Sequence, residues 1–512
     1  MKFLIIIIVA GIVLIALNPK VIKLFKRYIP WLDNQSVTLT NNFIPEQNYP
    51  VLYGFSAQKR IDTKDFVIYQ VWLNYYAKNP GNNQTSTTVF ENAASFLPSL
   101  AKMGVTIIQL SPVHPFGNFT TVGSPYGIKD YYDVNPGYAG FPNPASNPGT
   151  RDERVEAFKT YVAKAHQQGM KVIMDCIYHS TDPDNVLINS HPDFYVRSNG
   201  KVEKNKWGFA VLDYSNPEVR TYMINMTKYW ASTVGVDGLR ADVAIQVPLS
   251  FWAQLNNELK KMKPDWIMIA ESGSKLAEYG GIYSGLGYNG ESYDQVYGFD
   301  GIYGFAYMRA LRWILDNKQP ASILSTAWQY PEGGKPPSIP SLIIYRTIDN
   351  HDQRPRAAAL ASGNAGMMAA MVINLTLDGI PFIFNGQEIG DTNNTGVAIQ
   401  RFVSWSKPPH PENTAVLQQL ITLRKTHPAL HSGTTTWYST NLPDKVVSYL
   451  RTGGGEKILV VVNLSGNKWN GIVTGPDLNG TLTDLINSQK YFANAGKLSL
   501  SLPAYSYLIA KK

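Results

Sequence analysis

The sequence predicts an α/β protein built on a closed (β/α)8 barrel, the TIM-barrel fold, followed by a smaller C-terminal antiparallel β-sandwich domain. Over most of the 512 residues, short apolar runs alternate with stretches of helical periodicity, which is the pattern of parallel strands joined by crossover helices. From about residue 433 the apolar runs are separated only by turn residues, which is typical of antiparallel strands.

An apolar N-terminal segment comes first, from Phe3 to Leu17, within an anchor or signal region at residues 1–30 that also carries a basic flank. The apolar run is short for a membrane-spanning helix, which takes about 17–25 residues, and long for the apolar part of a signal peptide, which takes about 7–15. No small-x-small cleavage site follows, so an uncleaved membrane anchor is favoured over a cleaved signal peptide. Residues 31–60 are interpreted as a stem that leads to a body outside the cell, either anchored at its surface or secreted after cleavage.

Seven strand-like runs are evident in the barrel region, residues 61–432. They cover residues 66–73, 105–112, 171–177, 236–242, 266–272, 342–352 and 380–388. An eighth strand is expected near residues 296–302, because a closed barrel requires eight strand and helix units. Helices are expected between them, and Val155, Phe158 and Val162 share one helical face. A doubly wound open sheet is the competing architecture, but no glycine-rich phosphate loop follows the first strand.

The C-terminal domain, residues 433–512, contains three β-type runs at residues 445–452, 457–465 and 498–510. Glycine and asparagine turns separate them, and no helical stretch intervenes.

The composition excludes several classes of protein. Charged residues make up 16% of the chain, against roughly 25% in a typical soluble domain, so the surface must be rich in uncharged polar groups, as in an enzyme that works outside the cell. The formal net charge is +8, but lysines and arginines are scattered through the main body, which excludes a nucleic-acid-binding footprint. The single Cys176 cannot form an internal disulfide and is interpreted as a buried thiol.

Polar side chains stand at the C-terminal ends of four predicted barrel strands. They are Asp175, Arg240 with Asp242, Glu271, and His351 with Asp352. In a barrel these strand ends converge on the active-site face. Clustered carboxylates are costly unless chemistry uses them, and cleavage of a glycosidic bond uses one carboxylate as nucleophile or base and another as acid. A metal-dependent hydrolase would use clustered acids too, but such sites usually add several histidines, and the chain has only 8.

Six motifs together resemble those of the α-amylase family of glycoside hydrolases, over a stretch from about residue 66 to the C-terminus. The three that carry the chemistry are GLRAD at 238–242, AES at 270–272 and DNHD at 349–352. The other three are SPYGIKDYYDVNP at 124–136, VLDYSNPEVR at 211–220 and IPFIFNGQEIG at 380–390. Each motif is short, but all six occur in the order of the family.

The resemblance implies a role for each acid. Asp242 would be the nucleophile of a retaining mechanism, Glu271 the general acid and base, and Asp352 the residue that stabilises the transition state. Arg240 stands two residues before Asp242, so both side chains point to the same face of a strand. Its guanidinium would then keep the nucleophile ionised and correctly aimed.

Three substrate-binding residues are expected besides Arg240. The resemblance implies that Tyr126 is an aromatic platform for a sugar ring and that His351 binds a sugar hydroxyl. His179 stands where the family usually has an asparagine that helps to bind a structural calcium, and Ser180 stands where the family has a sugar-binding histidine. His179 is therefore a candidate for the sugar contact, with a histidine satisfied by a nearby backbone group as the alternative. The calcium site is in doubt, no metal ligand is assigned, and the chemistry needs no cofactor.

The leading functional hypothesis is a retaining hydrolase of α-1,4-linked glucose chains in starch, glycogen or maltooligosaccharides. A transglycosylase with the same site is one alternative, because water access and acceptor affinity at the site decide between the two reactions. Ile245 and Gln246 stand where the family often has a Lys-His pair on the leaving-group side, so the leaving-group preference of other members does not transfer to this chain. A non-catalytic, membrane-anchored amylase-like subunit is the other, although such subunits have typically lost the acids that are present here. The predicted partners are an α-glucan and, through the N-terminal segment, a membrane; no protein partner or nucleic acid is predicted.

Overall fold

The structure is a computed structural model. It describes residues 61–76, 89–117, 124–141, 146–271, 299–328, 343–393, 403, 405 and 407–512. The N-terminal anchor or signal region and the stem lie outside the described residues, and they stay predictions. Among the helices of the described residues, none is both long enough and apolar enough to span a membrane.

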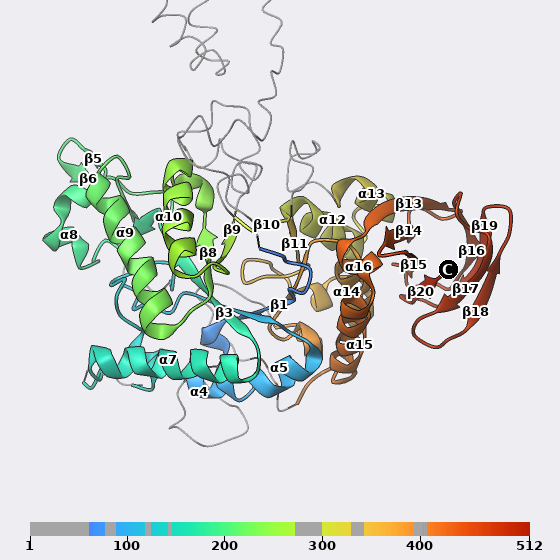
Figure 1. Cartoon of the computed structure of the whole chain (residues 1–512), viewed down its shortest axis with the longest axis horizontal. Coiled ribbons are helices and arrows are strands. Elements are labelled where there is room, and N and C mark those ends of the chain that lie inside the picture. Colours follow the sequence, from blue (N-terminus) through green and yellow to red (C-terminus); the bar gives the residue numbers. More distant parts are fainter. Residues whose placement is uncertain are drawn as a thin grey trace, which may run out of the picture.

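Eight parallel strands form a closed barrel (Figure 1). In chain order they are β1 (Ile68–Val71), β2 (Ile107–Leu110), β3 (Lys171–Ile177), β8 (Gly238–Asp242), β9 (Ile267–Ala270), β10 (Gly301–Tyr303), β11 (Ile344–Arg346) and β12 (Ile380–Phe384). Each strand pairs with its sequence neighbours, and β12 closes the barrel against β1. The predicted barrel is confirmed, including the eighth strand, which is β10.

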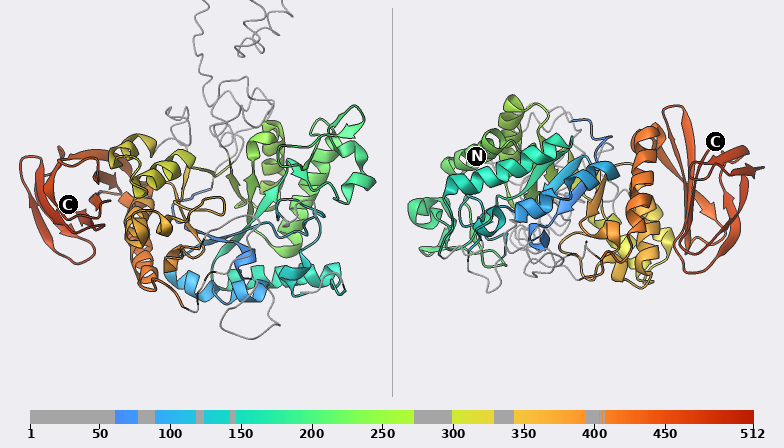
Figure 2. Two further views of the ribbon diagram at one scale, coloured as in Figure 1. Left: turned by 180° about the vertical axis from the view of Figure 1, so that it is seen from behind. Right: turned by 90° about the horizontal axis from the view of Figure 1, so that it is seen from below.

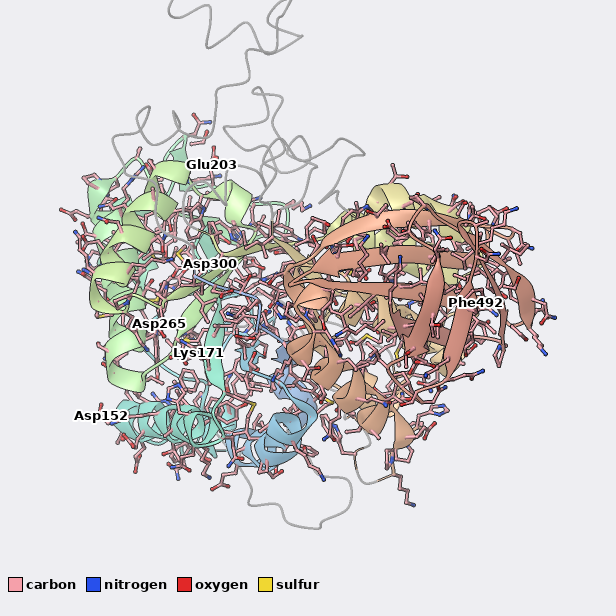
Figure 3. All side chains as sticks on the ribbon, turned by 45° about the vertical axis from the view of Figure 1, so that its right-hand side comes forward. Asp152, Lys171, Glu203, Asp265, Asp300 and Phe492 are labelled. Carbon is pink, nitrogen blue, oxygen red and sulfur yellow. The ribbon has the colours of Figure 1, made fainter. Side chains whose placement is uncertain are left out.

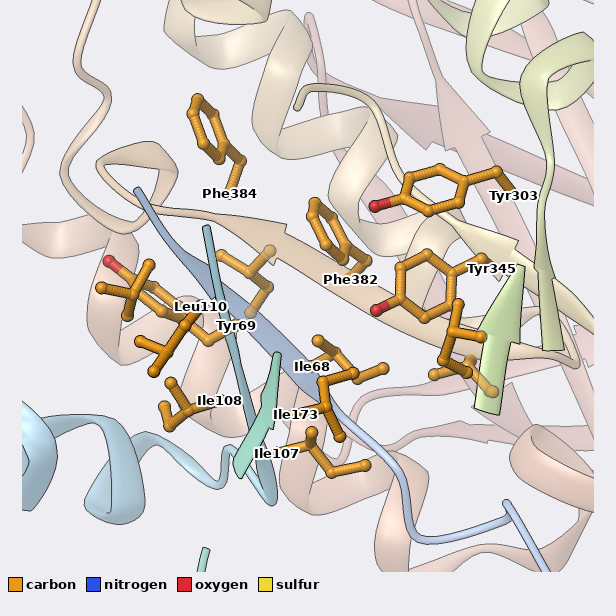
Figure 4. Close-up of a cluster of buried hydrophobic side chains, with 14 of the residues drawn as sticks. Ile68, Tyr69, Ile107, Ile108, Leu110, Ile173, Tyr303, Tyr345, Phe382 and Phe384 are labelled. Atoms are coloured by element: carbon orange, nitrogen blue, oxygen red, sulfur yellow. The ribbon is translucent and has the colours of Figure 1, made fainter. Parts of the chain in front are cut away.

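The barrel interior changes from apolar to polar along the strands. Ile68 on β1 is level with Ile107 on β2, and two residues further on Gln70 is level with Gln109. All four residues are completely buried. Figure 4 shows the apolar layer, in which isoleucines from β1 to β3 meet aromatic rings from β11 and β12. Because side chains two residues apart in a strand share a face, the apolar layer lies beneath a polar layer near the C-terminal strand ends.

Helices cover the outside of the barrel, so most strand residues are buried on both faces. The longer helices are α4 (Val89–Ala94), α5 (Leu97–Met103), α7 (Arg151–Gln167), α9 (Pro217–Tyr229), α10 (Leu249–Met262), α12 (Phe305–Leu315), α14 (Gly363–Thr376) and α15 (Glu412–Thr426). Helix α7 begins with a capping box, in which the Thr150 hydroxyl accepts the Glu153 N–H and the Glu153 carboxylate accepts the Thr150 N–H. Its predicted apolar face is buried, with Phe158 and Val162 at most 1% exposed.

A long excursion between β3 and α9 carries short elements near the C-terminal strand ends. They are β4 (Ser180–Thr181), α8 (Leu187–Ser190), β5 (Arg197–Ser198), β6 (Lys201–Val202) and β7 (Ala210–Val211). Strand β4 begins after two residues that follow β3 and pairs with β7, while β5 and β6 form a small hairpin. Further short α-helices in the described part of the chain are α6 (Pro136–Ala139), α13 (Leu324–Ala327) and α16 (Pro428–Ser432).

The C-terminal part of the chain is an eight-stranded antiparallel sheet. Its strands are β13 (Thr434–Thr440), β14 (Val446–Gly453), β15 (Glu456–Asn463), β16 (Trp469–Thr474), β17 (Gly480–Asp484), β18 (Lys490–Ala493), β19 (Lys497–Leu502) and β20 (Tyr507–Lys511). Strand β13 pairs first with β14 and then with β16, so the sheet turns over at β13 and encloses a core of its own.

The run at residues 498–510 is two strands rather than one. Pro503, which has no N–H to donate, follows β19, and Tyr505 has a positive φ of 52°. The Tyr505 N–H bonds to the Ser465 carbonyl at 3.0 Å and turns the chain toward β20. The alternating pattern on both sides of the turn hides this break in the sequence.

Strands β14 and β15 are buried on both faces. On β15, Ile458 and Val460 pack against the barrel core, whereas Leu459 and Val461 pack into the separate core of the C-terminal sheet. Figures 1 and 2 show α14, α15 and α16 between the barrel and this sheet. A hydrogen bond of 2.5 Å joins the hydroxyls of Thr376 on α14 and Tyr449 on β14. The sheet therefore completes the outer layer of the barrel.

The double burial of β15 predicts a position-dependent loss of stability. We expect Ile458→Ala to lower the free energy of unfolding by about 2–5 kcal/mol, because Ile458 is completely buried and the substitution leaves a cavity. Ile472→Ala is the matched control, since Ile472 in the same sheet is 39% exposed, and its effect should stay within about 0.5 kcal/mol. Denaturant unfolding measures both, and equal losses would contradict the packing described here.

Candidate active site

The acids and the arginine of the site stand at or just after the ends of neighbouring barrel strands. Asp175 lies on β3 and is level with Arg240 on β8, and Asp242 is the last residue of β8. Glu271 directly follows β9, and its N–H bonds to the Ala241 carbonyl at 3.0 Å. The structure thus brings the first three acids and the arginine to one face of the barrel.

Arg240 is the centre of the site. Its side chain is completely buried, and its Nη1 donates hydrogen bonds of 2.6 Å to Asp175 Oδ1 and to Asp242 Oδ1. Its Nη2 lies 2.7 Å from Glu271 Oε2. One guanidinium therefore contacts three carboxyl groups, which leaves more potential negative charge at the site than the arginine can balance.

The excess of carboxyl groups over positive charge, together with the burial of these groups, gives Asp242 and Glu271 different pKa values. Burial and the nearby Asp175 raise the pKa of Asp242 to about 6, although Arg240 opposes the shift. Burial, Asp242 and Asp352 raise the pKa of Glu271 to about 8, again against Arg240. Near neutral pH Asp242 is therefore mostly ionised and Glu271 mostly protonated, which are the states that a nucleophile and a general acid need.

Backbone geometry positions the Glu271 carboxyl group. The Val243 N–H donates a hydrogen bond of 3.0 Å to Glu271 Oε2, and the Ala244 N–H donates one of 3.0 Å to the Glu271 carbonyl. Val243 adopts a φ of +40°, which is an outlier for a β-branched residue. This turn, directly after Asp242, aims the N–H of Val243 at the neighbouring strand end.

A chain of hydrogen bonds connects Tyr126 and His351 to the acids. The Tyr126 hydroxyl is 2.9 Å from Asp175 Oδ2 and 2.7 Å from His351 Nε2, while Gln70 Nε2 is 3.1 Å from His351 Nδ1. One set of protons satisfies all three contacts: Gln70 donates to Nδ1, His351 donates from Nε2 to the Tyr126 oxygen, and Tyr126 donates to Asp175. Burial agrees with a neutral ring, because it lowers the pKa of His351 to about 4.

Aromatic stacking holds this group in place. The ring of Trp72 stacks on that of His351, with 4.5 Å between the ring centroids. The ring of Tyr126 also stacks on that of His351, with 5.5 Å between the centroids. Trp72 is completely buried, whereas Tyr126 is partly exposed. The side chain of Asp352 is 42% exposed, and its Oδ2 lies 3.4 Å from His351 Nε2, so Asp352 stands at the open side of the site.

His179 lies near Oδ2 of Asp242, whereas Arg240 contacts Oδ1. Its Nδ1 is 3.9 Å from Asp242 Oδ2, which is longer than a hydrogen bond, and this buried nitrogen has no hydrogen-bond partner in the described part of the chain. Burial and the positive charge of Arg240 lower the pKa of His179 to about 3, so the ring is neutral. The alternative of a histidine satisfied by a backbone group does not apply to Nδ1.

Three contributors were not assigned to the site from the sequence. Asp175 was recognised at a strand end but given no role, and Gln70 and Trp72 were not singled out. A polar glutamine inside the apolar run at residues 66–73 was the available indication, because a buried polar group needs a partner.

The described residues contain no group of three or more histidine, cysteine, aspartate or glutamate side chains that could hold a metal ion. His179, at the position of the expected calcium-binding asparagine, faces Asp242 instead.

Two carboxyl groups with separated pKa values at the C-terminal face of a (β/α)8 barrel are what a glycoside hydrolase needs. Residues 93–419 match the family model for the alpha amylase catalytic domain, and residues 435–509 match that for the maltogenic amylase C-terminal domain. The chain belongs to the α-amylase family of glycoside hydrolases and is an enzyme, as its motifs had indicated.

Relatives and solved structures agree with this family. The chain is 23% identical to a cyclomaltodextrinase of Geobacillus thermopakistaniensis, over 90% of this chain and 79% of that protein. It is also 23% identical to neopullulanase 2 of Thermoactinomyces vulgaris, over 87% of this chain and 77% of that protein. The crystal structure of a maltogenic α-amylase from Thermotoga neapolitana covers 88% of this chain and 99% of its own, with a TM-score of 0.72 and 25% identity.

The raised pKa of Glu271 predicts that Glu271→Gln stabilises the protein. Between the unfolded-state pKa of about 4.3 and the folded-state pKa of about 8, the folded chain binds the extra proton, so wild-type stability falls as the pH rises through this window. Glutamine cannot ionise and avoids this loss. We expect the melting temperature of Glu271→Gln to exceed that of the wild type by an amount that grows from pH 5 to pH 8.

Glu203→Gln is the control, because Glu203 is an exposed carboxylate on the surface (Figure 3). Its melting temperature should follow the wild type at every pH. A Glu271→Gln difference that does not change with pH would contradict the buried, protonated carboxyl group.

Proposed function

We propose that this enzyme is a retaining hydrolase that cleaves α-1,4-glucosidic bonds in starch, glycogen or maltooligosaccharides through a covalent glycosyl-enzyme intermediate. The observation that carries the proposal is the contact of one buried guanidinium with both Asp242 and Glu271, whose pKa values lie on opposite sides of neutrality. In a retaining glycosidase one carboxylate attacks while the other carboxyl group protonates the leaving oxygen.

In this proposal each acid uses one particular oxygen in the first step. Arg240 holds Asp242 Oδ1, so Oδ2 attacks the anomeric carbon. Glu271 Oε2 accepts the Val243 N–H and faces Arg240, so its proton is carried on Oε1 and passes to the glycosidic oxygen. The carbon–oxygen bond to the leaving sugar breaks as the bond to Asp242 forms.

The second step reverses these roles. Glu271, now ionised, takes a proton from a water molecule, and the water oxygen attacks the anomeric carbon and displaces Asp242. Two inversions retain the anomeric configuration. Arg240 stabilises Asp242 as it regains its negative charge, because the guanidinium is already in place and no reorganisation is needed.

The remaining residues bind the sugar in this proposal. Asp352 is exposed beside His351 and stabilises the positive charge that develops on the distorted sugar ring. Tyr126 offers its ring to the apolar face of the sugar, and its hydroxyl is held by Asp175 and His351. His179 uses its buried ring beside Asp242 for a contact with a sugar hydroxyl.

The substrate class is supported by the relatives. Those reported above are named as a cyclomaltodextrinase, a neopullulanase and a maltogenic α-amylase. All three names refer to α-linked glucose polymers or their products. We therefore include cyclic maltodextrins with the linear chains as candidate substrates.

The pKa values predict a bell-shaped pH dependence of kcat/KM. Activity should rise as Asp242 ionises near pH 6 and fall as Glu271 loses its proton near pH 8, which places the optimum near neutrality. Glu271→Gln should lower kcat on the order of 10²–10⁴-fold and remove the alkaline limb. Glu203→Gln should keep both limbs. Initial rates of maltooligosaccharide cleavage across this pH range measure the profile, and an alkaline limb that survives in Glu271→Gln would refute the acid assignment.

Product analysis tests the reaction itself. The full chain is incubated with a linear maltooligosaccharide and with a cyclic maltodextrin, beside an Asp242→Asn variant, and the products are separated by chromatography. We expect shorter linear sugars from the wild type and none from Asp242→Asn, because the amide cannot attack. Longer sugars beside shorter ones would mean that the enzyme is a transglycosylase rather than a hydrolase. Intact substrates in both reactions would refute α-glucan cleavage.

A further inference from the structure

Gln70 and Gln109 are two polar side chains in the barrel interior. They are level with each other on the neighbouring strands β1 and β2, and both are completely buried. Gln109 has partners at both ends of its amide: its Nε2 donates to the Tyr303 hydroxyl at 3.2 Å, and its Oε1 accepts the Tyr345 hydroxyl at 2.5 Å. Gln70 differs, because its Nε2 is 3.1 Å from His351 Nδ1 while its Oε1 has no partner within the described residues. The contact with the His351 ring is thus what the buried Gln70 amide provides.

The orientation of this amide follows from Asp175, at the far end of the chain of hydrogen bonds. Tyr126 has one hydroxyl proton, and its oxygen is 2.9 Å from Asp175 Oδ2 and 2.7 Å from His351 Nε2. If Gln70 accepted a proton from Nδ1 of the neutral ring, Tyr126 would have to donate to Nε2, and Asp175 Oδ2 would lose its donor. A buried carboxylate oxygen without a donor costs more than a neutral amide oxygen without one. Gln70 Nε2 therefore donates to Nδ1, and Gln70 Oε1 is the atom left without a partner.

The His351 ring is held so that each nitrogen keeps its partner. Trp72 stacks on the ring with 4.5 Å between the centroids and 10° between the planes, and a half turn of the ring would put carbon atoms opposite Gln70 and Tyr126. His351 Nε2 also lies 3.4 Å from Oδ2 of Asp352, at the open side of the site. The nitrogen that carries the proton is therefore the one nearer the open side, where in the proposed mechanism a sugar hydroxyl can accept it.

We propose that Gln70 is a positioning residue: it keeps the proton of His351 on Nε2 and thereby makes Tyr126 donate to Asp175. Its consequence for catalysis rests on the proposed α-glucan activity. Gln70 acts through three other side chains, since the hydrogen bonds run from its amide through the His351 ring and the Tyr126 hydroxyl to the Asp175 carboxyl group. A change at the first of these groups is therefore passed on to the last.

The state of Asp175 affects the proposed nucleophile, because Arg240 Nη1 donates to both Asp175 and Asp242 at 2.6 Å. Burial raises the pKa of Asp175 to about 6, and Arg240 and the Tyr126 hydrogen bond oppose the shift. Without that hydrogen bond Asp175 would keep its proton to a higher pH, and its charge would no longer oppose the ionisation of Asp242. The other titratable groups that face these two acids are Glu271 after β9, His179 after β3, Tyr303 on β10 and Tyr345 on β11. A substitution at Gln70 leaves all of them in place, so we expect it to lower the pKa of Asp242.

The direct test is nitrogen NMR of the full chain with isotope-labelled histidine, in which the His351 signals are assigned by their loss in His351→Gln. We expect a protonated Nε2 and a bare Nδ1 in the wild type, and a mixture of both neutral tautomers in Gln70→Met, because no donor then fixes the ring. Gln109→Met is the matched control, since it makes the same change at the same level of the barrel, and it should keep the wild-type tautomer. If Gln70→Met does not fold, Gln70→Asn keeps the amide but is one methylene too short to reach Nδ1, and the same mixture is expected. A proton on Nδ1 in the wild type, or an unchanged tautomer in the Gln70 variant, would overturn the proposal.

The pH dependence of kcat/KM for a maltooligosaccharide tests the consequence for catalysis. We expect Gln70→Met to lower kcat/KM about tenfold at neutral pH, as the loss of one buried hydrogen bond does. Its acidic limb should move below the wild-type position near pH 6, whereas Gln109→Met should keep that position. Equal losses of rate in the two variants with an unmoved acidic limb would reduce Gln70 to a packing residue and overturn its effect on Asp242. If the wild type cleaves no α-glucan, the proposed function fails, and the NMR measurement still decides whether Gln70 fixes the His351 ring.

Discussion

The contact of Arg240 with three carboxyl groups is the interaction on which the site depends. A completely buried guanidinium would cost several kcal/mol in lost hydration if it had no partners. The carboxyl groups in turn would be neutral at this depth without it. Neither part is stable alone, so the acids and the arginine form one electrostatic unit. The pKa values of about 6 and 8 at Asp242 and Glu271 are properties of this unit rather than of either acid.

The barrel supplies the geometry for this unit. Parallel pairing puts Asp175 level with Arg240, and the alternation along β8 places Asp242 on the same inner face. The strained turn at Val243 then brings an N–H group to Glu271 on the next strand end. The outer elements bring further side chains to this face: the loop after β2 carries Tyr126, and the segment after β3 carries His179. In the proposed mechanism the strand ends supply the reacting acids, and the loops supply the contacts with the sugar.

Much of this could be predicted from the sequence. The barrel strands were visible because strands buried on both faces appear as continuous apolar runs, and the acids were visible because they end those runs. Their order along the chain gave the family. The hydrogen bonds from Gln70 through His351 and Tyr126 to Asp175 could not be predicted, since they join residues up to 281 positions apart. The break between β19 and β20 was marked in the sequence only by Pro503, inside a run whose alternation continues on both sides.

The two-sided burial of β14 and β15 also affects how the chain can be recombined. Each strand supplies alternate side chains to two different cores, so the C-terminal sheet is not a detachable module. A chain cut after α16 would leave the apolar outer faces of α14 and α16 bare, and a substituted domain would have to match the barrel's surface as well as its own interior. Exchange of C-terminal domains between enzymes of this kind is therefore limited by shape complementarity at the helices rather than by the choice of linker.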